Sequence, residues 1–141
     1  MSVSFHTEEI KFSLKKKVLH KQWVKEWIIL HHKTPGSLSF SFTSNERIRL
    51  INTEFLNHNY FTDVISFDYT EEDVVSGDII ISVEEVKKNA DFYSADIEDE
   101  LRRVMIHGVT HLLGYSDGSQ EEKGIMRKKE NEALHLWKKL G

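Results

Sequence analysis

Residues 101–117 read LRRVMIHGVTHLLGYSD. Apolar residues recur in this stretch at helical spacing, and Asp96 lies where it can cap the first turn. We therefore predict a helix that begins after Asp96 and has as its apolar positions Leu101, Val104, Met105, Ile106 and Leu112. Gly114 can end this helix, because glycine adopts a positive φ without strain. The chain is expected to turn back after Gly114.

The segments around this helix alternate between strand and helix patterns. Short apolar alternations predict strands over residues 3–5, 38–42, 64–67 and 78–81, the last two being joined by a polar loop that ends at Gly77. Further helices are predicted over residues 12–32, 45–56, 82–93 and 119–140, with Ser82 and Ser119 as N-caps. This order indicates an α+β fold, with helices packed on a small mixed sheet of roughly four strands.

The helix predicted over residues 12–32 has one apolar side. Its apolar side is expected to contain Leu14, Val18, Trp23, Trp27 and Leu30. The sequence Thr34-Pro35-Gly36 includes the only proline and is expected to end this helix in a turn.

Length and composition limit the class of protein. A chain of 141 residues is enough for one compact domain, so we expect residues 1–141 to form a single domain. The absence of cysteine excludes disulfides and thiol nucleophiles. No signal peptide is recognisable and no apolar run is long enough to span a bilayer, so a cytoplasmic protein is expected. A net charge of −4 argues against general binding of nucleic acid and leaves a local basic groove open.

His107 and His111 are spaced i, i+4 on the predicted helix. Such residues share a face, with Cβ atoms about 5–6 Å apart, so both rings can reach one metal ion. Asp117, beyond the turn, could add a carboxylate, and two histidines with one carboxylate leave a position for water, as catalytic metal sites do. Alternatively, Asp117 only caps a turn or the helix near Ser119, and the spacing alone leaves both interpretations open.

The residue after the first histidine argues against a peptidase. Zinc proteases with a comparable helix carry a glutamate there as general base, whereas this chain has Gly108. Glycine cannot transfer a proton, but it allows another backbone or a substrate to approach the helix closely.

A second candidate segment is TDVISFD, residues 62–68. Strand alternation places Val64, Ser66 and Asp68 on one face. Small hydroxyl residues on an otherwise apolar strand suit a face that borders a cleft and hydrogen-bonds a ligand, although turn and edge residues would give the same pattern. The sequence has no glycine-rich phosphate loop, serine nucleophile elbow or RNA-stacking aromatic motif.

Three blocks together resemble a known family. They are TDVISF (residues 62–67), GDIIIS (residues 77–82) and RVMIHGVTHLLGY (residues 103–115). In this order they resemble the YbeY endoribonucleases, rRNA maturation factors built around a histidine-rich metal site. The resemblance spans nearly the whole chain and implies a metal-dependent hydrolase with a zincin-like metal site on a helix.

The resemblance also implies the site residues. The metal ligands would be His107, His111 and Asp117, the last standing where the family usually has a third histidine. One divalent ion is implied, with zinc expected and manganese or iron made acceptable by the carboxylate. The positions implied to bind or support the substrate are Thr62, Asp63, Ser66 and Arg103.

The chain departs from the family at two other positions. Thr110 stands where the family commonly has leucine, a minor change if that side packs internally. Leu56 stands where the family often has an arginine that faces RNA, so that phosphate contact must be absent or come from another residue.

The implied activity is cleavage of single-stranded RNA during maturation and quality control of small-subunit rRNA. The partner would be the small ribosomal subunit, with neither DNA nor a membrane expected. A local basic groove would bind the RNA, and its candidate walls are Lys15–Lys25, Arg47, Arg49, Arg102 and Arg103. Two alternatives remain: a metal hydrolase or iron oxygenase acting on another substrate, and a non-catalytic ribosome-assembly factor.

Overall fold

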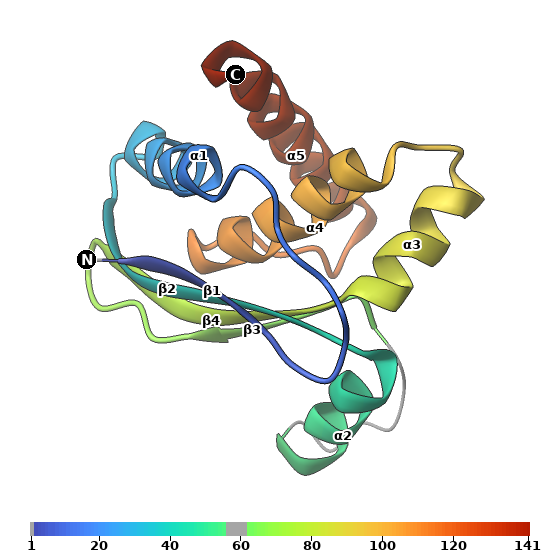
Figure 1. Ribbon diagram of the computed structural model, residues 1–141. Helices are drawn as coiled ribbons and strands as arrows, with labels where there is room; N and C mark the ends of the chain where they lie inside the picture. Colours follow the sequence, from blue (N-terminus) through green and yellow to red (C-terminus); the bar gives the residue numbers. More distant parts are fainter. Residues whose placement is uncertain (1, 56–61) are drawn as a thin grey trace.

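The computed structural model describes residues 2–55 and 62–141 and has a mixed four-stranded sheet partly covered by helices (Figure 1). The elements are β1 Val3–Thr7, α1 Lys17–Leu30, β2 Thr34–Thr43, α2 Asn45–Phe55, β3 Val64–Asp68, β4 Val74–Ser82, α3 Val83–Phe92, α4 Ile97–Leu112 and α5 Gln120–Leu140. The strand order is β1-β2-β4-β3, in which only the β3–β4 pair is antiparallel. The predicted α+β class is confirmed.

The two faces of the sheet are covered unequally. Helices α1, α4 and α5 lie over one face, where the main core contains Trp23, Phe40 and Ile106 (Figure 1). Helix α2 covers the other face through a smaller cluster in which Ile48 and Ile51 pack with β3 residue Ile65. Strand alternation separates these two cores, because neighbouring residues of β3 and β4 point to opposite faces.

The predicted N-caps are confirmed. Asp96 accepts hydrogen bonds from two backbone N–H groups at the start of α4. Ser82 caps α3, and Ser119 forms a capping box with Glu122 at the start of α5. These caps fix the starts of the three helices that follow β4.

The prediction for the first helix was wrong about the residue at which the helix begins and about two of the residues that it buries. Helix α1 begins at Lys17, because Lys16 has a φ of 57° and cannot continue a right-handed helix. Val18 and Leu30 are exposed, and the buried stripe of α1 consists of His20, Trp23, Val24, Trp27 and Ile28. These positions recur every three to four residues and form the face that packs on α4 and α5.

A predicted turn and the predicted end of a loop both lie within strands. Strand β2 begins at Thr34, and its register with β4 shifts between Pro35 and Leu38, where a proline without an N–H group is tolerated. Gly77 lies inside β4 rather than at the end of a loop. A Cβ atom on Gly77 would lie 2.5 Å from the carbonyl oxygen of Phe67, so glycine serves close strand packing there.

Helix α4 approaches the sheet closely at Gly108. A Cβ atom on Gly108 would lie 2.8 Å from Cγ2 of Ile79 and 3.1 Å from Oγ of Ser66. The sequence predicted that Gly108 allows another backbone or a substrate to approach the helix closely, and in the structure it is the sheet that does so. This packing places the histidine face of α4 beside β3.

Thr110 is fully buried, as expected if its side of α4 packs internally. Its hydroxyl accepts a hydrogen bond from Nε1 of Trp27 at 3.1 Å and donates one to the carbonyl oxygen of Ile106 at 2.6 Å. Leu56, the other departure from the family pattern, lies outside the described residues. Within residues 2–55 and 62–141, no helix combines the length and the apolar character needed to cross a membrane.

We expect Gly108→Ala to lower the free energy of unfolding. Overpacking against Ile79 costs about 1–3 kcal/mol, and the better helix propensity of alanine returns about 1 kcal/mol. The control Gly124→Ala, in α5, has no atom within 4 Å of the new Cβ and should gain stability. Urea denaturation of both variants checks the opposite signs, and a Gly108→Ala protein as stable as Gly124→Ala would contradict this packing.

Candidate metal centre

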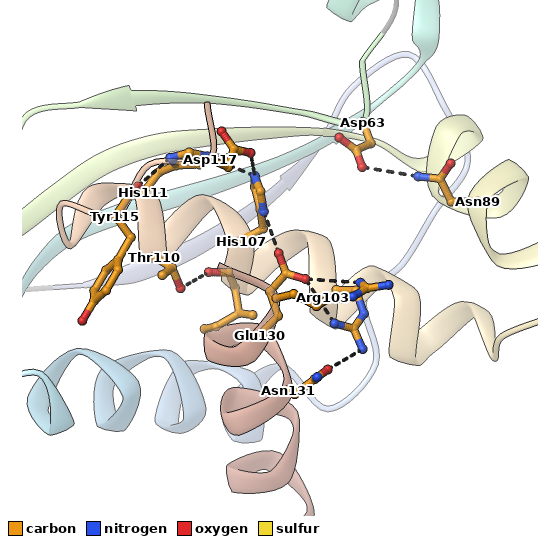
Figure 2. Close-up of polar contacts among 12 residues, drawn as sticks. Asp63, Asn89, Arg103, His107, Thr110, His111, Tyr115, Asp117, Glu130 and Asn131 are labelled. Atoms are coloured by element: carbon orange, nitrogen blue, oxygen red, sulfur yellow. Dashed lines mark hydrogen bonds and ion pairs between the residues drawn. The ribbon is translucent and has the colours of Figure 1, made fainter. Parts of the chain in front are cut away.

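The two histidines of α4 lie one turn apart and point to the same side of the helix (Figure 2). Their ring centroids are 4.6 Å apart, and their Nε2 atoms are 3.0 Å apart. His107 and His111 are both half-buried and line a cleft bordered by β3.

The chain turns back after α4 and brings Asp117 to the histidines. Gly114 has a φ of 103°, as predicted for the residue that ends this helix. Oδ2 of Asp117 lies 3.3 Å from Nε2 of His107 and 3.6 Å from Nε2 of His111. The ligand atoms of a tetrahedral zinc site, each about 2.0–2.1 Å from the ion, are about 3.3 Å apart. The three atoms thus have the spacing of three corners of such a site.

The competing interpretation of Asp117 as a helix cap is weakened by the geometry. Ser119 caps α5, and its side chain accepts a hydrogen bond from the backbone N–H of Glu122. Asp117 instead offers its carboxylate, whose side chain is 41% exposed, to the two histidines.

The tautomer of each histidine is set by a partner at Nδ1. In His107, Nδ1 donates to Oε2 of Glu130 at 2.7 Å, because a carboxylate can only accept. In His111, Nδ1 donates to the carbonyl oxygen of Tyr115 at 2.9 Å. Each neutral ring therefore has its lone pair on Nε2, and the two lone pairs meet 3.0 Å apart. Such an arrangement repels itself unless a proton or a cation lies between the two nitrogens.

Glu130 is a residue of the candidate site that the sequence prediction missed. Its side chain is 8% exposed and is paired with His107, with Arg103 at 3.1 Å and with Arg127 at 3.5 Å (Figure 2). A carboxylate that orients a metal-ligating histidine also increases the basicity of the ring. Glu130 thus holds His107 through Nδ1, while Nε2 of the ring faces Asp117.

The pKa values of this pair move in opposite directions. Burial alone lowers the pKa of His107, but the hydrogen bond and charge of Glu130, with the charges of Asp117 and Asp63, raise it above its ordinary value. Burial alone raises the pKa of Glu130, but its contacts with His107 and Arg103 bring it below its ordinary value. Glu130 is therefore ionised near neutral pH.

A signal for Glu130 is present in the sequence. The buried residues of α5 are Met126, Glu130, Ala133 and Trp137, which follow helical spacing. A single charged residue in an otherwise apolar stripe must have a buried partner. The partner, His107, is 23 residues away and could not be named without the fold.

The histidines and Asp117 line a cleft of about 1070 Å³ between β3, α4 and the start of α5. All four residues implied by the resemblance to bind or support the substrate also line it: Thr62, Asp63, Ser66 and Arg103. The structure brings these residues together with the three candidate ligands. Their contacts differ, since Asp63 accepts a hydrogen bond from Asn89 while Arg103 is held by Glu130 and Asn131.

Most of the cations predicted to form the walls of an RNA groove do not line this cleft. Among the described residues that line the cleft, the cations are Arg103 and Arg127. Arg102 is buried against the ring of Trp137 at 4.3 Å and donates to Asp99, away from the cleft. Lys15–Lys25, Arg47 and Arg49 belong to α1, the segment before it, and α2. Arg127 was not among the predicted cations.

Two carboxyl groups of the cleft hold their protons to higher pH than usual. Burial raises the pKa of Asp63, although the charge of His107 acts against it. Burial likewise raises the pKa of Glu100, opposed by the charge of Arg103. A carboxyl group whose pKa is raised in a cleft is a candidate proton donor.

Comparison with known proteins gives one consistent result. The model of the family Endoribonuclease YbeY matches residues 2–138. An Endoribonuclease YbeY from Flavobacterium psychrophilum is 42% identical over 135 residues, covering 96% of each chain. Another from Bacteroides thetaiotaomicron is 40% identical over 136 residues, covering 96% of this chain and 99% of the relative.

A solved structure agrees with these relatives. The solution structure of TM1509 from Thermotoga maritima has a TM-score of 0.65 and 26% identity, covering 98% of this chain and 93% of that one. The chain belongs to the endoribonuclease YbeY family, as the resemblance predicts. The predicted enzyme class, a nuclease that hydrolyses phosphodiester bonds, is that of the family.

We expect Glu130→Gln to weaken metal binding about 10–100-fold, because a neutral amide lacks the negative charge that increases the basicity of the His107 ring. In the metal-free protein, the pKa of His107 should fall, since the negative charge that raises it is removed. Competition with a chromophoric chelator and an NMR titration of His107 measure the two effects. Glu132→Gln, an exposed neighbour on α5, is the matched control, and equal affinities for the two variants would contradict this role.

Proposed function

We propose that the chain is a metal-dependent endoribonuclease that cleaves single-stranded RNA during maturation and quality control of small-subunit rRNA. The observation that supports this most directly is the convergence of two histidine lone pairs and one carboxylate oxygen within 4.8 Å of one another. The family provides the reaction class, and the cleft provides room for a strand beside the centre.

We propose that His107, His111 and Asp117 hold one divalent ion, and that this ion is zinc. The donor set of two imidazoles and a carboxylate fits zinc, and the harder carboxylate keeps manganese and iron as alternatives. When bound, such an ion polarises a phosphoryl oxygen and lowers the pKa of a bound water.

The protein residues have separate parts in this proposal. Glu130 keeps His107 in the tautomer that presents Nε2, and Arg103 keeps the Glu130 carboxylate in place. Thr62 and Ser66 offer hydroxyl groups to the phosphate or ribose of the RNA. Asp63 and Glu100 are the proposed carriers of the leaving-group proton, because burial raises their pKa values.

Electrostatics in the cleft give the metal a second role in RNA binding. The acidic groups that line the cleft are Asp63, Asp68, Glu100, Asp117 and Glu130. They outnumber the cations, and Arg103 is occupied by its pairing with Glu130. We propose that a divalent cation offsets these charges and that Arg127, whose side chain is 57% exposed, contacts an RNA phosphate.

The remaining parts of the proposal concern the setting. We propose that residues 1–141 act as one domain, and that the protein works in the cytoplasm on the small ribosomal subunit. No DNA or membrane partner is proposed. Two rivals are another metal-dependent hydrolase or oxygenase, and a non-catalytic assembly factor that retains the metal only for structure. Family membership favours the nuclease over both.

We expect His107→Ala to lower cleavage of single-stranded RNA at least about 100-fold, because one ligand of the catalytic ion is lost. The control His135→Ala changes an exposed histidine of α5 and should cleave as the parent does. Cleavage of an unstructured RNA is measured beside circular dichroism, which confirms that both variants fold. Undiminished cleavage by the folded His107→Ala protein would exclude the metallonuclease.

We expect Asp117→Ala to weaken metal binding about tenfold or more and Asp117→His to retain it, because imidazole can occupy the same corner of the site. The histidine variant should also prefer zinc over manganese more strongly, since imidazole is the softer ligand. Metal titrations of both variants check these outcomes. If Asp117→Ala binds as tightly as the parent, Asp117 is not a ligand.

A further inference from the structure

Two neighbouring aromatic side chains are exposed at the end of α3. Phe92 is 80% exposed and Tyr93 is 62% exposed. Single exposed apolar residues are ordinary on a protein surface and need no explanation. Two adjacent aromatic rings at the border of a cleft are different, because contiguous apolar surface of this kind is typical of a place where a ligand binds.

The Tyr93 side chain lines the same cleft as the three candidate metal ligands. It lies shortly before Asp96, the N-cap of α4, whereas His107 lies on the second half of that helix. With a rise of about 1.5 Å per residue, Asp96 and His107 are about 16 Å apart along the helix axis. The cleft therefore extends along α4 from the metal centre to Tyr93.

The position of the Tyr93 ring is restrained by its surroundings. The N–H group of Tyr93 donates to the carbonyl oxygen of Asn89 at 3.0 Å, and Ser94 has a φ of 52°, the left-handed conformation in which many helices end. The ring of Phe92 meets that of Tyr93 edge to face, with centroids 4.9 Å apart. A ring restrained in this way loses little conformational entropy when a second flat ring stacks on it.

The charges of the cleft give RNA little affinity through its phosphates. Among the described residues that line the cleft, the cations are Arg103 and Arg127, and Arg103 is paired with Glu130. Phosphate contacts to so few cations contribute little to binding. Stacking of a base on an aromatic ring requires no charge and adds roughly tenfold or more to the affinity for each base.

We propose that the ring of Tyr93 stacks on an unpaired base of the RNA strand that reaches the metal centre. This inference rests on the proposed function, because it concerns how the same cleft holds its substrate. An unpaired base can present its face to an aromatic side chain, whereas a base within a duplex is already stacked between its neighbours. Stacking on Tyr93 thus favours single-stranded over double-stranded RNA. Since the ring is remote from the reacting phosphate, it contributes to substrate binding and not to the chemical step.

The test is the cleavage kinetics of an unstructured RNA with the protein and three variants, all loaded with zinc. Tyr93→Ala should raise KM about tenfold and change kcat by less than about twofold, because a binding contact remote from the reaction is lost. Tyr93→Phe keeps the aromatic ring and should restore KM. The matched control Tyr69→Ala removes a tyrosine that is 57% exposed and lies outside the cleft wall, and it should have the KM of the parent. Circular dichroism checks that every variant folds.

A second measurement distinguishes stacking from a structural role of Tyr93. KM is determined for a series of RNA substrates that each lack the base of a different nucleotide. At one nucleotide, loss of the base should raise the KM of the parent about tenfold and leave that of Tyr93→Ala unchanged, because both changes remove the same contact.

The outcomes distinguish this inference from the proposed function. If the parent cleaves RNA and the KM of Tyr93→Ala is unchanged, stacking is excluded while the nuclease stands, and the aromatic pair is left for a protein partner. Stacking is also excluded if Tyr93→Phe behaves as Tyr93→Ala does, or if base loss raises KM equally in the parent and Tyr93→Ala at every nucleotide. A parent protein that cleaves no RNA overturns both.

Discussion

The hydrogen bond from Nδ1 of His107 to the buried carboxylate of Glu130 joins the metal centre to the packing of α5 on α4. A buried carboxylate costs several kcal/mol unless it is paired. Here His107, Arg103 and Arg127 surround it, and they come from both helices. The charge is satisfied only when α5 lies against α4. The packing of α5 on α4 and the orientation of His107, the first candidate ligand, therefore depend on the same contacts.

The second constraint is the distance between α4 and the sheet. Gly108, between the two histidines, lets the helix lie against Ile79 and Ser66. Strand β3 is at the edge of the sheet, so its polar residues face a cleft on one side of the helix. Figure 2 shows the result, with Asp63 on one side of the cleft and Glu130 on the other. A peptidase-like glutamate at position 108 could not fit between helix and sheet.

The features that could be predicted from the sequence are those determined by interactions between residues close together in the chain. The caps at Ser82, Asp96 and Ser119, the turn at Gly114 and the shared face of the two histidines depend on residues a few positions apart. The convergence of Asp117 on the histidines also follows from one short turn.

Other features depend on partners distant in the sequence. The role of Glu130 in the site depends on its contact with His107. Which side of α1 is buried depends on where α4 and α5 pack against it, and not on the sequence pattern of α1 alone. Proline and glycine are typical of turns, but Pro35 and Gly77 each lie in a strand. The register shift with the adjacent strand tolerates Pro35, and the close approach of the adjacent strand requires a residue as small as Gly77. The basic residues near α1 could not be assigned to a surface before the position of that helix was known. The groove predicted from composition therefore includes elements that do not line the cleft.

The turn after Gly114 divides the metal centre into a fixed part and an adjustable part. Two imidazoles are anchored on a buried helix, and their orientation costs no further ordering when an ion arrives. The third candidate donor, Asp117, lies on the segment between α4 and α5, and its side chain is 41% exposed. The family resemblance implies an imidazole where this chain has a carboxylate, and the surrounding scaffold accommodates the exchange. An exchange of imidazole for carboxylate at position 117 changes one candidate donor and leaves the other residues that line the cleft in place.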